Sequence, residues 1–130
     1  MDNYPKDLKY SKEHEWVRAS GESATIGITF YAQDSLGDIV YVDLPKPGAS
    51  FAANTPMATI ESVKAASDVF APVSLTVVEA NPVLADAPET VNRDPYGAGW
   101  MVKVKLTNPA ELDSLMDPVA YEAHVEAAGH

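Results

Sequence analysis

The chain of 130 residues contains no cysteine. Structural disulfides, a thiolate nucleophile and a zinc–thiolate site are therefore excluded, and any thiol–disulfide chemistry would need a cofactor to supply the sulfur. No apolar run approaches the ~20 residues that a membrane span needs. Residues 1–5 lack the basic start and apolar stretch of a signal peptide. We expect a cytoplasmic protein of bacterial type that is not in a membrane, with a mature mitochondrial form left open.

Basic residues are scarce. Nine lysines and arginines stand against 19 aspartates and glutamates, so the formal net charge is −10. Such a field would repel nucleic acid and anionic membrane surfaces and would favour partners with basic patches. The negative charge could equally serve only to keep an abundant protein soluble. Hydrophobic residues make up 46% of the chain, which argues against wholesale disorder.

Familiar catalytic motifs are missing as well. His14, His124 and His130 are scattered without metal-ligand spacing. Gly97-Ala98-Gly99 is too short for a phosphate loop, and no serine stands in a nucleophile elbow. The sequence therefore predicts no metal site, no catalytic residue and no enzyme.

Short β-strands dominate what is present. Alternating, β-branched or aromatic runs separated by Pro/Gly turns predict a sandwich or flattened barrel in one domain, 1–130. Thr29 can cap a short helix that runs through Leu36 and ends at Gly37. Residues 1–12 read as an extended lead-in, and 81–99 as irregular with a helical turn near Val83. Strands are expected at 16–19, 23–28, 39–42, 57–62, 66–70, 75–80 and 100–106.

The C-terminal part predicts one clear strand followed by helices over 108–127. In 100–106 we expect Met101 to share a face with Lys103 and Lys105, opposite Val102, Val104 and Leu106. Asn108 is placed to cap the first helix, with Glu111 reaching back to the cap's amide. A second helix begins at Asp117-Pro118, and the last residues are expected to fray.

Lys64 lies between two predicted strands, where a hairpin tip would project its amine into solvent. Val63 and Ala65 leave it uncrowded, and a long flexible stem could move a cargo between sites. A lone lysine at a turn is more often an ordinary surface charge. The surrounding sequence decides between the two readings.

Ordered blocks over nearly the whole chain resemble the glycine cleavage H-protein family, whose members carry lipoic acid. Val63 before the lysine is typical of that family, whereas other lipoyl domains usually have an acidic residue there and biotin carriers have methionines on both sides. The blocks are His14–Val17, Ala24–Thr29, Leu36–Val40, Glu61–Asp68, Ala71–Ser74, Asp94–Gly97 and Gly99–Met101.

The resemblance implies a mainly β, lipoyl-domain-like barrel-sandwich hybrid with a short internal helix and C-terminal helices. It implies lipoic acid held as an amide on Lys64, installed by a lipoylating enzyme. The carrier would take an aminomethyl group from glycine decarboxylase (the P protein) to aminomethyltransferase (the T protein). Dihydrolipoamide dehydrogenase (the L protein) would then reoxidise the arm. We expect a monomer.

The resemblance also implies a cleft that shelters the loaded arm. His14, Glu15 and Asp68 are the candidate residues, since carboxylates would favour a cationic cargo and partial burial would exclude water. His14, beside Trp16, could equally be a packed histidine. Glu13 stands where some family members have a small hydroxyl residue, so its participation is open.

Two alternatives and two departures from the family pattern remain. A non-catalytic relative acting in lipoate transfer or as a binding module would have no reason to keep Lys64. An acid–base enzyme using residues 13–15 is disfavoured, because neighbours on a strand point to alternating faces. Leu75 stands where the family usually has glycine, so it must adopt an ordinary β conformation or be strained. Phe30 replaces a more usual polar residue, and it could be exposed or tuck under the short helix.

Overall fold

The computed structural model describes residues 4–127 and is mainly β, as predicted. Every predicted strand is present, shifted by at most two residues at either end. The strands are β1 Lys9–Tyr10, β2 Glu15–Ser20, β3 Ser23–Ile28, β4 Ile39–Asp43, β5 Ser50–Phe51, β6 Pro56–Ser62, β7 Ala66–Phe70, β8 Leu75–Ala80 and β9 Val102–Leu106. The helices are α1 Phe30–Leu36, α2 Val83–Asp86, α3 Thr90–Arg93, the 3₁₀-helix η1 Pro109–Ser114 and α4 Pro118–Ala127.

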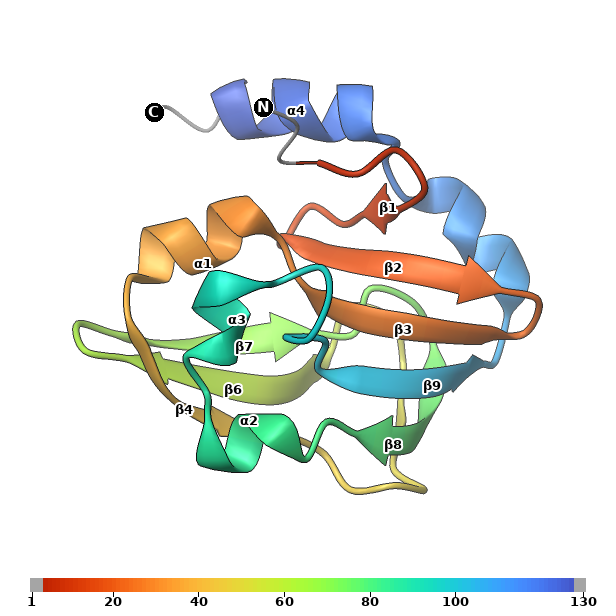
Figure 1. The fold of residues 1–130 in the computed structure, drawn as a ribbon. Coiled ribbons are helices and arrows are strands. Elements are labelled where there is room, and N and C mark those ends of the chain that lie inside the picture. The colour runs from red at the N-terminus through yellow and green to blue at the C-terminus, as the bar shows by residue number, and fades with distance from the viewer. Residues whose placement is uncertain (1–3, 128–130) are drawn as a thin grey trace.

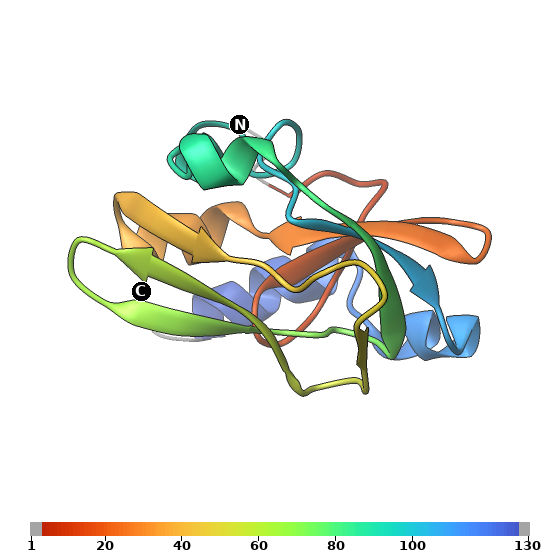
Figure 2. The ribbon, with the colours of Figure 1, turned by 90° about the horizontal axis from the view of Figure 1, so that it is seen from below.

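The strands form two open sheets rather than a closed barrel. The larger has the order β1-β2-β3-β9-β8-β5 and the smaller β4-β6-β7, and every pairing is antiparallel. Figures 1 and 2 show the smaller sheet beside the larger one, with the β6–β7 hairpin projecting at the left margin of both views. The predicted sandwich or flattened barrel is confirmed.

Local signals set α1 correctly. The Thr29 hydroxyl accepts a hydrogen bond from the Ala32 amide at 3.2 Å and caps the first turn. Gly37 ends the helix with a φ of 79°, a backbone angle that favours glycine. Phe30, the first residue of α1, is half-buried, and its amide donates to the Tyr96 hydroxyl.

Residues 8–10 are more than an extended lead-in, because they are part of a sheet and of a core. Leu8 and Tyr10 are almost fully buried, and β1 pairs with β2. They belong to a second apolar cluster beneath α4, together with Trp16 and Tyr121. Figure 1 shows β1 and the described segment before it lying between α4 and β2. Their burial depends on a helix more than a hundred residues away, so nothing near residue 10 signals it.

The C-terminal part brings three corrections. Met101 is fully buried because it precedes β9 and does not follow the strand's alternation. Asn108 makes no side-chain cap bond, and Glu111 does not reach back to it. The Glu111 carboxylate instead accepts from the amide and hydroxyl of Ser74, at 2.7 and 3.2 Å. It therefore ties η1 to the start of β8.

Leu75 resolves the departure from the family pattern. It lies in β8, paired with Leu106, and its side chain is fully buried. It has ordinary strand geometry, since no positive φ is recorded there. The larger side chain fills core space that a glycine would leave empty.

The 81–99 region is more regular than expected. The predicted helical turn near Val83 is α2, but α3 was not predicted. Gly99 makes the packing of α3 possible, because a Cβ there would lie 2.7 Å from the Asp94 carbonyl oxygen and 2.9 Å from that of Thr90. Within residues 4–127, no helix is long and apolar enough to cross a membrane. The expected fraying at the C-terminus lies outside the described residues.

Candidate functional site

Lys64 lies where the sequence predicts it, at the exposed tip of the β6–β7 hairpin. The Ser62 amide donates to the Ala65 carbonyl at 2.7 Å and closes the turn. The Ser62 hydroxyl also accepts from the Ala65 amide at 3.1 Å. Because the turn satisfies its own backbone groups, the lysine is presented by a defined loop. Ser62 was not singled out from the sequence, although serine at the start of a turn is a known signal.

The stem of Lys64 runs past the end of α1. A Cβ built on Gly37 would lie 3.8 Å from Lys64 Cε. The Val63 amide donates to the Asp38 carbonyl at 3.0 Å, which holds the tip against the α1–β4 connection. The hairpin tip is therefore held by this bond together with the β4–β6 ladder, in which Ile39 pairs with Ser62.

One face of β7 leads from the lysine towards the body of the molecule. Ala66, Asp68 and Phe70 alternate with Ser67 and the buried Val69, so they share a face of the strand. Asp68 is exposed on that face and pairs in register with a residue of β6. At ~3.3 Å per residue, the strand extends about 13 Å from Ala66 to Phe70.

A cleft of about 530 Å³ lies where β7 ends. Phe70 and Pro72 line it from the β7 side, Ser11 and Glu13 from the β1–β2 connection, and Glu111 from η1. The exposed Glu13 is thus placed on the wall of the cleft. Ser11 and Phe70 were missed from the sequence, because only the tertiary fold brings the two segments together.

Glu15 is not a solvated surface acid. It is 1% exposed, and its carboxylate accepts from the Ser11 hydroxyl and, at 3.1 Å, from the Phe70 amide. Burial raises the pKa of Glu15 to about 7, and the hydrogen bonds from Ser11 and Phe70 partly offset that rise. The residue joins the start of β2 to the end of β7, directly behind the cleft.

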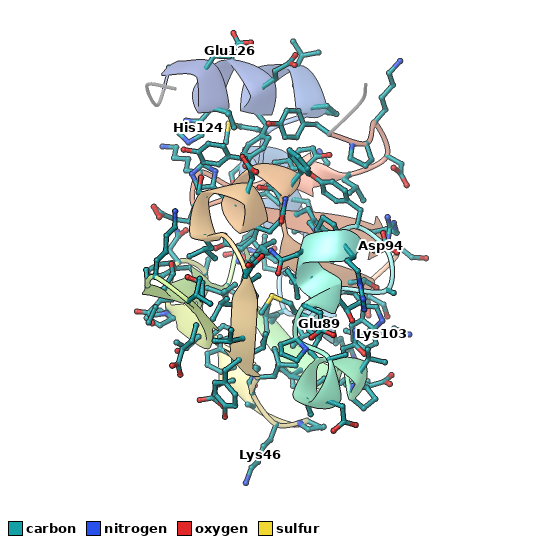
Figure 3. The ribbon with its side chains drawn as sticks, turned by 60° about the vertical axis from the view of Figure 1, so that its left-hand side comes forward. Lys46, Glu89, Asp94, Lys103, His124 and Glu126 are labelled. Atoms are coloured by element: carbon teal, nitrogen blue, oxygen red, sulfur yellow. The ribbon has the colours of Figure 1, made fainter. Side chains whose placement is uncertain are left out.

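His14 lies under α4. Its Nδ1 is 2.8 Å from the Tyr121 hydroxyl, and its ring contacts those of Tyr31 and His124. Figure 3 shows His124 on the side of α4 that faces the rest of the molecule. His14 has a φ of 75°, so the chain turns sharply between Glu13 and Glu15. A contact between His14 and the arm stays a prediction.

Residues 13–15 do not converge on one point: Glu13 faces the cleft, His14 faces α4, and Glu15 is buried. This divergence gives no support to the acid–base enzyme. No group of three or more metal-ligating side chains gathers anywhere in 4–127. The geometry consists of a projecting amine, a strand face bearing a carboxylate, and a cleft whose charged lining residues are Glu13, Glu111 and Lys12.

Comparison with known proteins agrees with this arrangement. The family model of the glycine cleavage H-protein matches residues 8–128. The glycine cleavage system H protein of Carboxydothermus hydrogenoformans is 53% identical over 129 residues, covering 99% of each chain. That of Escherichia coli O7:K1 is 54% identical over 127 residues, covering 97% of this chain and 98% of the relative.

A solved structure shows the same fold. The crystal structure of a glycine cleavage system H protein from Mycobacterium marinum superposes with a TM-score of 0.85 at 35% sequence identity. The match covers 92% of this chain and 96% of that chain.

Proposed function

The chain belongs to the glycine cleavage H-protein family, and we propose from this premise that it carries its lipoyl group as an amide on Lys64. Its role is that of the lipoyl-bearing carrier in the glycine cleavage system. The observation that supports Lys64 is its place at the exposed tip of a self-bonded hairpin. The alternative role in lipoate transfer has no support among the relatives.

The residues at the tip fit such a group. An enzyme that acylates the amine needs to approach it from solvent, and both neighbours, Val63 and Ala65, are exposed. Acylation removes one positive charge but buries nothing and breaks no hydrogen bond of the Ser62–Ala65 turn. When bound, the lipoyl group would supply a disulfide that can be opened to accept the aminomethyl group.

We propose that the chain shelters the loaded arm along β7 and in the cleft. Asp68 lies on the strand face between Lys64 and the cleft, and Glu13 lies on the wall. Their carboxylates would attract a cationic cargo, while the walls exclude water. We assign Glu15 the task of holding β7 against the Ser11 segment, through the Phe70 amide. His14 remains a candidate that would act from the α4 side.

The proposed carrier is not itself an enzyme, and residues 1–130 would work as one carrier domain. Its partners would be the P, T and L proteins and a lipoylating enzyme. This chain has a net charge of −10, so we expect it to dock on basic patches at the surfaces of these partners. We propose the cytoplasm as its compartment and a monomer as its state.

The attachment site can be tested by intact mass after expression with lipoate and a lipoylating enzyme. We expect a lipoyl mass increment in the wild type and in Lys46→Arg, and none in Lys64→Arg. Lys46 is a matched control, since Figure 3 shows it extending into solvent from the loop after β4. An increment that persists in Lys64→Arg would contradict the assignment.

The cleft can be tested separately with loaded protein. Asp68→Asn and Glu13→Gln should each shorten the lifetime of the aminomethyl-loaded arm, because less negative charge faces the cargo. Asp43→Asn, an exposed acid on β4, is the control and should not change that lifetime. Loading with glycine and P protein, followed by quantifying formaldehyde release, measures it. Equal lifetimes in all four proteins would overturn the role of these carboxylates.

A further inference from the structure

Asn92 lies on α3, and both polar atoms of its side chain form hydrogen bonds with residues 33–39, which include the end of α1 and the start of β4. Its Nδ2 donates to the Gly37 carbonyl at 2.8 Å and to Gln33 Oε1 at 3.0 Å. Its Oδ1 accepts from the Ile39 amide at 2.9 Å. One side chain therefore forms hydrogen bonds with the backbone of the α1–β4 connection on both sides of Asp38, at Gly37 and at Ile39.

Asp38 is the residue that supports the hairpin tip. Its carbonyl accepts from the Val63 amide, one residue before Lys64. Gly37, on its other side, is near the Lys64 stem, since a Cβ built there would lie 3.8 Å from Lys64 Cε. The Asn92 side chain thus acts on the Lys64 tip through one backbone hydrogen bond, the bond between Val63 and Asp38, without touching the lysine.

Asn92 could have other reasons to make these bonds, such as the stability of α3. The three bonds that dock α3 also fix the backbone on both sides of Asp38, so stability and positioning are separate effects that an experiment can distinguish. A comparable asparagine elsewhere does work of that kind: Asn81 donates to the carbonyls of Ala98 and Trp100 and accepts from the Val83 amide. Its bonds close the base of the 81–100 loop, which also carries Asn92, but none of them goes to residues 33–39.

We propose that Asn92 is a positioning residue that holds the Lys64 tip in the geometry in which a lipoylating enzyme accepts it. This inference rests on the proposed function of Lys64. Without the Asn92 hydrogen bonds, the α1–β4 connection would be more mobile, and the Lys64 tip would sample several orientations. If the lipoylating enzyme binds only one orientation, its apparent dissociation constant equals the intrinsic constant divided by the fraction of molecules in that orientation.

The test compares Asn92→Ala and Asn92→Asp with the wild type and with Asn81→Ala. In Asn92→Ala we expect the KM for the unmodified protein in lipoylation to rise roughly three- to tenfold, with kcat nearly unchanged. Asn92→Asp keeps the acceptor for the Ile39 amide but loses both donated bonds, so its KM should rise as well. Asn81→Ala should lose stability without a change in KM.

Amide hydrogen exchange provides a readout that does not depend on modification. The Val63 amide should exchange faster in both Asn92 variants, because its bond to Asp38 is loosened. The Ser62 amide, bonded to Ala65 within the turn, should be less affected, and the Val77 amide, bonded to Ala49, should not change. In Asn81→Ala, the Val63 amide should not exchange faster than the loss of global stability alone explains.

The two hypotheses fail in different ways. A wild type that accepts no lipoyl group on Lys64 overturns the proposed function and this inference with it. A wild type that is modified, with Asn92 variants of unchanged KM and unchanged Val63 exchange, overturns the inference alone. An equal rise in KM for Asn81→Ala would assign the effect to stability and would also overturn it.

Discussion

At the scale of single residues, Glu15 is an acidic side chain in a buried environment. It is buried between the Ser11 segment and β7, and its pKa rises from 4.5 to about 7. The folded protein therefore binds this proton more tightly than the unfolded chain does. The resulting stabilisation is complete below the unfolded pKa and is lost as the pH rises through about 7.

We predict that Glu15→Gln removes this pH dependence. The difference between 4.5 and about 7 corresponds to at most about 3 kcal/mol. Between pH 4.5 and 8, the free energy of unfolding of the wild type should fall by up to that amount relative to the variant. Urea titrations at several pH values measure it. Parallel curves for the two proteins would contradict the raised pKa.

Leu75 is a second informative residue, since its side chain occupies a core site in β8. We predict that Leu75→Ala lowers the free energy of unfolding by about 2–5 kcal/mol, because it removes buried carbon and leaves a cavity. Val78→Ala on the same strand is the control. Val78 is 61% exposed, so its truncation should change stability by less than about 0.5 kcal/mol. Similar losses in both variants would contradict the core assignment.

At the scale of elements, α4 is joined to the rest of the molecule by Tyr121. Its ring stacks on that of Tyr10 with centroids 4.7 Å apart. Its hydroxyl lies 2.7 Å from Thr29 Oγ1 and 2.8 Å from His14 Nδ1. Since Thr29 also caps α1, one hydroxyl connects the C-terminal helix, the turn before β2 and the first turn of α1.

We predict that Tyr121→Phe lowers the free energy of unfolding by about 1–3 kcal/mol, because Thr29 and His14 lose a buried partner. Amides of α4 should also exchange faster. Tyr41→Phe, which removes a hydroxyl from a side chain that is 52% exposed, should have little effect. Urea unfolding and hydrogen exchange measure the two effects. A variant as stable as the wild type would show that the ring stack alone holds α4.

At the scale of the whole molecule, the excess of negative charge dominates the electrostatics. Among residues 4–127, the ion pairs recorded are Arg18–Asp7 at 3.7 Å and Arg93–Glu89 at 3.9 Å, and both lie at the surface. Pairs of this kind contribute little. We therefore expect repulsion among the remaining carboxylates to outweigh attraction in the folded state.

We predict that raising NaCl from about 10 mM to about 300 mM increases Tm by a few degrees, because the Debye length falls from roughly 30 Å to below 8 Å. Differential scanning calorimetry at pH 7.5 measures this increase. Sucrose at equal osmolality provides a control for effects that do not depend on charge. A lower Tm at high salt would show that attractive pairs dominate.

Much of the fold could be predicted because its signals are local. The cap at Thr29, the glycine at Gly37 and the alternation in β3 and β9 each act within a few residues. The α3 helix could not be predicted in this way. It is only four residues long, and it is held by contacts with Gly99 and by the bonds of Asn92 to the α1–β4 connection.

The sequence by itself determined the strand pattern, the short helix α1 and the hairpin that presents Lys64, because period, caps and turn residues act over neighbouring positions. Tertiary structure alone decided the burial of Tyr10 and Glu15 and the cleft at the end of β7. It also decided the hydrogen bonds between Asn92 and the α1–β4 connection beside the lysine. These features join segments as much as 111 positions apart, such as Tyr10 and Tyr121. A burial or a hydrogen bond of that kind exists only after the chain has closed on itself.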